Sequence, residues 1–284
     1  MNFYLGCAVW SYEGWLGNFY PAKTPAKNFL KTYSDRLNCV EGNTTFYAVP
    51  ALATIQKWQQ ETPANFKFCL KFPQTVTHQG LLYPQRTEAE AFIERVRPLG
   101  QKLGCIFAQL PPSYAPHYFE DLRDFLITLK GQNIPLAVEV RHLDWWQSPH
   151  QSKLTHLLET LEIAQVILDT RPVYHCADDP QRFSKNKKPL VPVNFSLTTH
   201  WAIARYISHP QLALNEIYLT EWLTQVKQWL QQDKTVYFFV HCPLEDHSPF
   251  TARYFYQALQ KVYPEVAPIP WDFVADSPQQ LSLF

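Results

Sequence analysis

Eight short apolar or alternating runs recur along the chain at intervals of about 30 residues, the spacing of strand–helix units. The runs have the length of strands: Phe3–Val9, Cys39–Asn43, Phe66–Phe72, Gly104–Leu110, Pro135–Arg141, Ile163–Asp169, Trp201–Ser208 and Thr235–His241. The segments between them repeat apolar residues at helical spacing: Pro25–Leu37, Ala51–Glu61, Thr87–Lys102, His117–Lys130, Ser152–Leu161, Tyr218–Gln232 and Pro249–Val262. This pattern predicts a TIM-like (β/α)8 barrel, although spacing alone also fits a doubly wound sheet.

The pattern assigns residues 1–263 to one barrel domain and residues 264–284 to a Pro-rich, then polar, C-terminal extension with a mobile end. One segment, Arg171–His200, breaks the strand–helix alternation and contains the basic run R-F-S-K-N-K-K-P. It follows the sixth predicted strand, where a loop at the barrel mouth belongs. We read it either as a solvated charged loop or as a loop that contacts phosphate.

The strand Cys39–Asn43 has an unusual pair of faces. Val40 is apolar, whereas Glu41 and Asn43 point to the opposite side with a carboxylate and an amide. In a (β/α) barrel, inward side chains near the carboxyl ends of the strands form the active site. This predicts Glu41 as a site residue; the alternative is a buried, paired glutamate with a structural role.

The same alternation, applied to all eight strands, predicts a ring of polar side chains at one end of the barrel. Its inward members are Glu41, Asn43, Lys71, Gln109, Glu139, Arg141, Asp169, Arg205 and His241, with His78, His142 and His209 in the loops just beyond. Such a ring is either a balanced salt-bridge network, with pairs such as Glu139–Lys71 or Glu41–Arg141, or an anion site.

The chemistry of these residue types suggests individual roles. Glu41, Glu139 or Asp169 would serve as a general base, and His241 as an acid or base near neutral pH. Guanidinium groups hold phosphate or carboxylate bidentately, which favours Arg141 and Arg205 as grips. The remaining substrate-binding candidates are the aromatic residues Trp10, Tyr12, Trp15 and Tyr47, which would stack on a ligand or cap the core, together with Thr45 in the mouth loop.

A divalent metal is a weaker prediction. Carboxylates and histidines on different strands are ligands for zinc or manganese, but the neighbouring cations Lys71, Arg141 and Arg205 oppose a metal at the same place. The sequence therefore leaves the metal unknown.

Composition limits the function classes. Lys plus Arg equals Asp plus Glu at 25 each, so no global basic field exists to hold nucleic acid. The sequence has no apolar run as long as a membrane span, and its start reads as a first strand rather than a signal peptide. The six cysteines form no C-x-x-C pair and read as reduced core residues, which favours the cytoplasm.

Several motifs, in order along the chain, carry a family resemblance. They are G-C-A-V-W-S-Y-E-G-W-L-G-N-F-Y-P from Gly6, K-F-P-Q-T-V-T-H from Lys71, F-A-Q-L-P-P-S-Y from Phe107, A-V-E-V-R-H-L-D-W-W from Ala137, Y-F-F-V-H-C-P from Tyr237 and S-P-F-T-A-R from Ser248. With these motifs the chain resembles the YecE-like family, the domain of unknown function 72. The resemblance implies a TIM-like barrel and no known reaction.

The last five residues, Gln280 to Phe284, read Q-L-S-L-F. They resemble the pentapeptide by which bacterial proteins bind the DNA sliding clamp, with Gln280 as polar anchor and Leu281, Leu283 and Phe284 in apolar pockets. The alternative is an apolar terminus packed on its own barrel. The tail favours a DNA-processing or repair enzyme acting on phosphodiesters or damaged nucleotides. The rival hypotheses are a small-molecule hydrolase or isomerase for a phosphorylated or carboxylated sugar, and a non-catalytic clamp-recruited binding protein.

Overall fold

A computed structural model describes residues 2–175 and 188–274 of the chain. Eight parallel strands form one sheet in which each strand is hydrogen-bonded to its neighbours in the order β1-β8-β7-β6-β5-β4-β3-β2. The strands are β1 (Phe3–Cys7), β2 (Cys39–Gly42), β3 (Lys67–Lys71), β4 (Leu103–Gln109), β5 (Leu136–Glu139), β6 (Ala164–Asp169), β7 (Trp201–Ile207) and β8 (Thr235–His241). The predicted TIM-like (β/α)8 barrel is therefore confirmed, with every strand within a few residues of its expected bounds.

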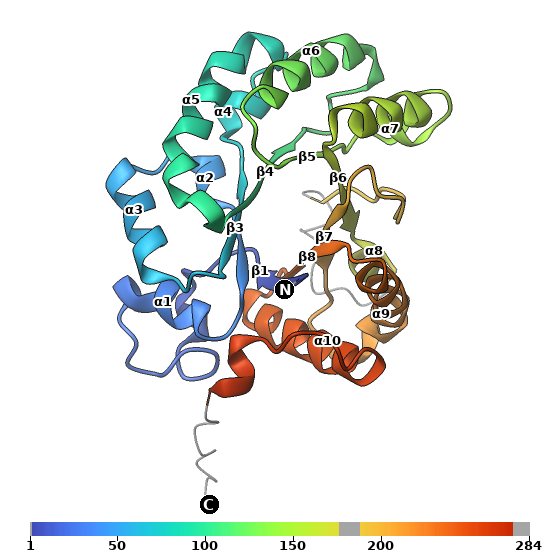
Figure 1. The fold of residues 1–284 in the computed structure, drawn as a ribbon. Coiled ribbons are helices and arrows are strands. Elements are labelled where there is room, and N and C mark those ends of the chain that lie inside the picture. The colour runs from blue at the N-terminus through green and yellow to red at the C-terminus, as the bar shows by residue number, and fades with distance from the viewer. Residues whose placement is uncertain (1, 176–187, 275–284) are drawn as a thin grey trace, which may run out of the picture.

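The helices form an outer ring around the strands (Figure 1). They are α1 (Phe29–Ser34), α2 (Thr44–Tyr47), α3 (Leu52–Glu61), α4 (Gln74–Thr77), α5 (Arg86–Val96), α6 (Phe119–Lys130), α7 (His150–Leu161), α8 (Arg171–Tyr174), α9 (Glu216–Gln231) and α10 (Ser248–Val262). The short helices α2, α4 and α8 follow the carboxyl ends of β2, β3 and β6, and the apolar periodicity did not predict them because each has only four residues. Among the described residues, no helix is both long and apolar enough to span a membrane.

Two apolar cores lie on the two sides of the barrel wall. Outward residues such as Val40, Leu70 and Val138 pack against the helices in the larger core. Inward residues, including Phe107 and Tyr237, fill the barrel below the mouth. The inward positions change from apolar to polar toward the strand carboxyl ends, and this change creates the site described below.

The barrel closes between β1 and β2 through side chains rather than through a strand ladder. The Asn38 side chain accepts from Leu5 N–H at 2.7 Å and donates to Phe3 C=O at 3.1 Å. The Tyr33 hydroxyl accepts from Cys7 N–H at 2.7 Å and donates to the carbonyl of Cys39 at 3.0 Å. These two buried side chains satisfy backbone groups that a continuous sheet would pair.

The first part of the predicted extension packs on the barrel. Ile269 and Trp271 are buried, and Trp271 N–H donates to the carbonyl of Arg36 at 2.9 Å. The hydroxyl of Tyr256, on α10, donates to Asp272 Oδ2 at 3.0 Å. The tail Gln280–Phe284 lies outside the described residues.

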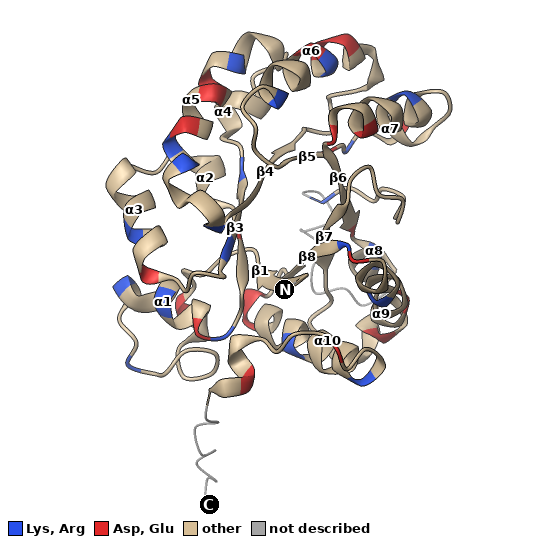
Figure 2. Ribbon diagram, in the orientation of Figure 1, with Lys and Arg blue, Asp and Glu red and all other residues tan. Residues whose placement is uncertain are grey.

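Charges of both signs are interspersed on the outer helices, as α5, α6 and α7 show in Figure 2. This distribution agrees with the equal numbers of acidic and basic residues. Five of the six cysteines lie in the described part of the chain, and all five are free and buried.

Candidate functional site

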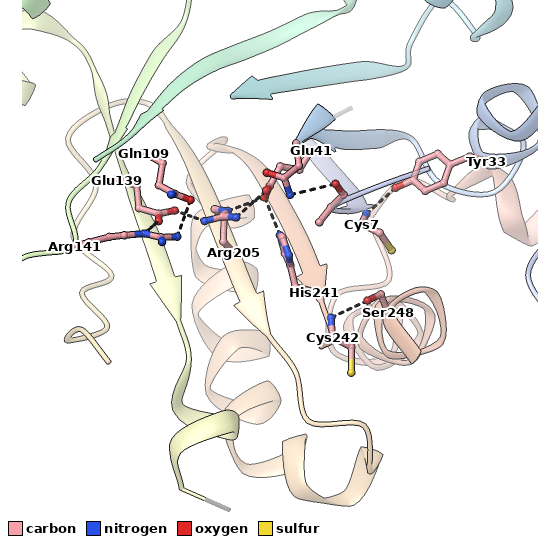
Figure 3. A network of polar contacts seen from close by, with 12 residues as sticks. Cys7, Tyr33, Glu41, Gln109, Glu139, Arg141, Arg205, His241, Cys242 and Ser248 are labelled. Carbon is pink, nitrogen blue, oxygen red and sulfur yellow. Dashed lines mark hydrogen bonds and ion pairs between the residues drawn. The ribbon is translucent and has the colours of Figure 1, made fainter. Parts of the chain in front are cut away.

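Arg205, on β7, is the centre of a buried ionic network at the carboxyl ends of the strands (Figure 3). Its guanidinium makes a bidentate pair with Glu41 on β2, with Nε–Oε2 at 2.7 Å and the second nitrogen–oxygen distance at 2.8 Å. A third guanidinium nitrogen donates to Glu139 on β5. Arg205 is 5% exposed and both glutamates are fully buried, so the network fixes three strands from different parts of the barrel to one another.

Three further contacts extend the network across the barrel mouth. Arg141 donates from Nε to Glu139 Oε1 at 2.6 Å and from Nη2 to Gln109 Oε1 at 2.7 Å. His241, on β8, lies with Nε2 at 3.0 Å from Glu41 Oε2. The network therefore spans from β8 to β4 and brings Arg141, which lies just beyond the end of β5, back over the barrel mouth.

The network holds its members in defined charge states. Burial alone would raise the pKa of Glu139, but Arg205 and Arg141 outweigh burial and lower it to about 2. For Glu41, burial is likewise outweighed by Arg205 and His241, and its pKa lies far below the ordinary value. Burial lowers the pKa of His241 to about 4 against the attraction of Glu41, so its imidazole is neutral at physiological pH. Carboxylates whose pKa lies this far below neutral pH are weak bases and abstract protons poorly.

Two lysines add positive charge to the mouth. Lys71, at the end of β3, is 5% exposed, and its Nζ lies 3.4 Å from the centroid of the Phe46 ring. Burial, followed by the charge of Arg205, lowers the pKa of Lys71 to about 7. Lys188 comes from the long segment after β6; burial and then Arg205 lower its pKa to about 8.

Glu245, in the loop after β8, does not balance these cations. Its Oε1 atom is buried and has no hydrogen-bond partner among the described residues. Burial raises the pKa of Glu245 to about 8, so the carboxyl is mostly protonated at neutral pH. A hydrogen bond with Ser248 and the charge of Lys188 act against this shift but do not cancel it.

The described mouth therefore has more positive than negative charge. Its ionised carboxylates are Glu41 and Glu139, and both are already engaged by Arg205. The cationic side chains are Arg141 and Arg205, together with Lys188, which is mostly protonated at neutral pH, and Lys71, which is about half protonated. Buried positive charge without matching carboxylates is costly unless an anion binds, so this imbalance is the electrostatic mark of an anion site.

A pocket of about 530 Å³ opens beside Arg141 at this end of the barrel. Its lining residues are Pro112, Arg141, His142, Leu143, Asp144, Pro189 and Leu190. The volume suits a small molecule. A second pocket of about 370 Å³ lies at the opposite end, by the strand starts, where Lys130 is already paired with Glu162 at 2.8 Å. We favour the mouth, because the polar network converges there.

The sequence matches the family model "Protein of unknown function DUF72" over residues 4–272. The chain belongs to the DUF72 family. It is 32% identical over 284 residues to the UPF0759 protein YecE of Escherichia coli strain K12, with 99% of each chain covered. It is also 31% identical over 157 residues to the UPF0759 protein YunF of Bacillus subtilis, covering 51% of this chain and 53% of that protein.

Solved DUF72 structures share the fold. The protein from Thermotoga maritima superposes with a TM-score of 0.66 at 22% identity, covering 92% of this chain and all of the other. The protein from Enterococcus faecalis gives a TM-score of 0.63 at 18% identity, covering 92% and 96%. The family description names no reaction, so the chemistry of this DUF72 site must be argued from its own residues.

Most of the predicted ring residues of this DUF72 chain do converge, but their pairing differs from both pairs proposed from sequence. Arg205 pairs with Glu41 and with Glu139, whereas Lys71 forms no ion pair among the described residues. Arg205 was predicted to grip a phosphate. Its guanidinium is instead engaged by two carboxylates. Arg141 also pairs with Glu139 but lines the pocket, and Lys71 and Lys188 are the further cations of the mouth.

The prediction that Asp169 points into the barrel was wrong. Asp169 faces the helices, where it accepts hydrogen bonds from Trp222 Nε1 and Arg171, both at 2.8 Å. Its neighbour Leu168 is the inward residue, in an apolar cluster with Val173 and Ile207. Asp169 is therefore separated from the mouth by the barrel wall.

The aromatic candidates separate into two groups. Trp10 and Trp15 are buried in the core between strands and helices, which supports the core-capping alternative. Tyr12 donates its hydroxyl to Asp246 at 2.9 Å, and Tyr47 is 75% exposed at the rim.

The remaining candidates lie near the mouth with other contacts. Asn43 donates to the carbonyl of Ala8 at 3.3 Å, and Thr45 donates to the carbonyls of Gly42 and Lys71. His142 lines the pocket, and His209 is buried with Nε2 unpartnered among the described residues.

His78 is half-buried, and its ring packs edge-on against Phe46 at 5.0 Å between centroids. Burial, with Lys71 and Arg141, lowers its pKa to about 4. The sequence analysis did not include Phe46 or Glu245 in the site. Glu245 could have been found as an acidic residue that lies just before the start of α10. Among the described residues, no group of three His, Cys, Asp or Glu side chains is arranged to hold a metal.

Proposed function

We propose that this protein is an enzyme that binds a small anionic metabolite, phosphorylated or carboxylated, in the mouth of its barrel and transforms it there. The observation that carries the proposal is the excess of cations over ionised carboxylates among the described mouth residues. Glu41 and Glu139 balance the charges of Arg205 and Arg141, and Lys71 and Lys188 are the further cations of the described mouth. The pocket beside Arg141 supplies room for a sugar-sized molecule.

The test compares a charged ligand with its uncharged parent. We expect ribose 5-phosphate, and inorganic phosphate more weakly, to raise the melting temperature, whereas ribose does not. A ligand at 100 times its Kd stabilises the folded state by about 2.7 kcal/mol. Each of the substitutions Arg141→Gln and Lys188→Gln should weaken binding by about tenfold or more, since each removes a charge-assisted contact of about 1.5–3 kcal/mol.

Lys153→Gln, at an exposed position on α7, is the matched control and should bind as the unchanged protein does. Equal stabilisation by ribose and ribose 5-phosphate would contradict the proposal. So would unchanged affinity in both mouth variants.

We also propose that the DNA sliding clamp recruits this enzyme to DNA. This proposal is based on a separate observation, the Q-L-S-L-F tail, and it belongs to the hypothesis of a DNA-processing enzyme. The mouth groups are nearly buried, so a DNA substrate would have to enter as an extruded or released nucleotide rather than as intact duplex. Two leucines and a phenylalanine, each buried in a pocket, contribute about 1.5–3 kcal/mol apiece to the binding free energy. The entropy lost when the tail becomes ordered offsets much of this gain.

A peptide of residues 275–284 should therefore bind purified clamp with micromolar affinity, about −8 kcal/mol. The same peptide with Leu283→Ala and Phe284→Ala should not bind. Deleting Leu283 and Phe284 from the whole protein should leave its melting temperature nearly unchanged. Marked destabilisation by that deletion would show that the tail packs on the barrel and would remove this link to DNA.

A further inference from the structure

Lys71 differs from the other buried lysine in the described chain. Lys102 is 8% exposed, and its Nζ donates to the carbonyl of Thr62 at 2.6 Å and also reaches the carbonyl of Gln59. Lys71 is slightly more buried, yet its Nζ makes no hydrogen bond or ion pair with any described residue. Of these two buried lysines, Lys102 has hydrogen-bond acceptors among the described residues and Lys71, in the barrel mouth, has none.

The surroundings of Lys71 disfavour its ammonium form. Burial and the positive charges of Arg205 and Arg141 disfavour the ammonium, and they outweigh the Phe46 ring under Nζ, which by itself favours the cation. Glu139 and Glu41 offset this only in part, because Arg205 engages both. Burial is the main cause that lowers the pKa of Lys71 to about 7. At neutral pH the side chain is therefore a free amine in about half of the molecules. An ordinary lysine with a pKa near 10.4 is neutral in only about one molecule in a thousand or fewer.

We propose that Lys71 is a nucleophilic amine that forms an imine with the aldehyde or ketone carbon of an anionic carbonyl compound held in the mouth. Desolvation in an apolar site and a cationic neighbour are the two ways by which proteins activate lysine for this chemistry, and Lys71 has both. The inference rests on the proposed function, because the anionic group of the same substrate would be held by Arg141 and Lys188.

The step needs no partner reagent. The Nζ lone pair forms a bond to the carbonyl carbon as the carbonyl π electrons move to oxygen, and a proton passes from nitrogen to that oxygen. The resulting hydroxyl leaves as water with a second proton, while the nitrogen lone pair forms the C=N bond. One carbonyl compound and one amine give one imine and one water, without oxidation or reduction.

The experiment traps the imine by reduction. The full-length protein is incubated with glycolaldehyde phosphate, or with pyruvate, in the presence of cyanoborohydride, which delivers hydride to the imine carbon and leaves a stable secondary amine. Intact mass and peptide mapping then locate the adduct. We expect the main adduct on Lys71, several-fold above Lys188 and at least about tenfold above any other described lysine at pH 7, because its free-amine fraction is larger.

Three variants make the result specific. Lys71→Arg keeps the charge, Lys71→Met approximates the side-chain volume, and both should lose the adduct. Lys67→Arg alters the other end of the same strand, where Lys67 faces the Tyr4 ring at 5.9 Å, and should keep it. Acetaldehyde, which lacks an anionic group, should label Lys71 at least about tenfold less than glycolaldehyde phosphate, corresponding to about 1.4 kcal/mol.

Labelling spread over exposed lysines and unchanged in Lys71→Arg would overturn the proposal, as would equal labelling of Lys71 by acetaldehyde. The anion site and the amine role of Lys71 can be contradicted independently of each other. If ribose 5-phosphate stabilises the protein and no adduct forms on Lys71, the amine role is wrong and Lys71 is only an anion-binding cation. If ribose 5-phosphate does not stabilise the protein, the anion site itself is wrong.

Discussion

At the scale of single residues, strand alternation predicted the inward placement of Glu41, Glu139, Arg205 and His241 because outward apolar residues flank each of them. It failed at Asp169, which follows the continuous apolar run Val166–Leu168 and therefore has no alternating signal beside it. A displacement by one residue reverses the face of a strand residue. Alternation also cannot tell which charges pair, since Arg205 and Glu41 are 164 positions apart.

The central position of Arg205 leads to a stability prediction. Arg205→Met leaves two buried carboxylates without their main partner and should destabilise the protein by about 3–5 kcal/mol at pH 7, measured by urea denaturation. Arg123→Met, which removes exposed ion pairs with Glu120 and Asp124, should change the free energy of unfolding far less.

The pH dependence of this effect follows from Glu139. Its folded pKa of about 2 lies below the ordinary value of 4.5, so its contribution is complete above about pH 4.5 and is lost as pH falls through about 2. The cost of Arg205→Met should therefore shrink as pH falls. A cost that does not change between pH 7 and pH 3 would contradict the assigned charge states.

At the scale of elements, the eight strands were predictable from periodicity, but the closure of the barrel was not. The β1–β2 seam depends on Tyr33 and Asn38, which lie in a helix and a loop and carry no strand signal. Gly6 permits the close approach, because a Cβ at this position would lie 2.2 Å from the carbonyl oxygen of Cys39. Such contacts depend on the three-dimensional neighbour rather than on local pattern.

Tyr33→Phe tests the seam, because it keeps the ring and removes only the hydroxyl. The Cys7 N–H and Cys39 C=O lose a buried partner, which should destabilise the protein by about 1–3 kcal/mol. Amide exchange should also become faster at Cys7. Tyr47→Phe, at a residue 75% exposed, should change stability by less than about 0.5 kcal/mol. Equal stability of the two variants would show that the hydroxyl does not hold the seam.

At the scale of the whole molecule, a neutral chain concentrates uncompensated positive charge at one end of its barrel. The outer helices carry both signs (Figure 2), whereas the mouth holds Lys71 and Lys188 in addition to Arg205 and Arg141, whose charges Glu41 and Glu139 balance. The sequence predicted a polar ring but not its net charge. That charge depends on the protonated state of Glu245 and on the neutral imidazoles of His78 and His241, which burial determines.

The titration of Lys71 tests this account most directly. In protein labelled with 13C-lysine, with Lys71→Arg used to assign the signal, nuclear magnetic resonance should show Lys71 titrating near pH 7. Ribose 5-phosphate should raise that pKa, because a bound anion favours the ammonium form, and ribose should leave it unchanged. A Lys71 pKa near the ordinary 10.5, or one that ribose 5-phosphate does not move, would contradict an anion site built around a desolvated amine.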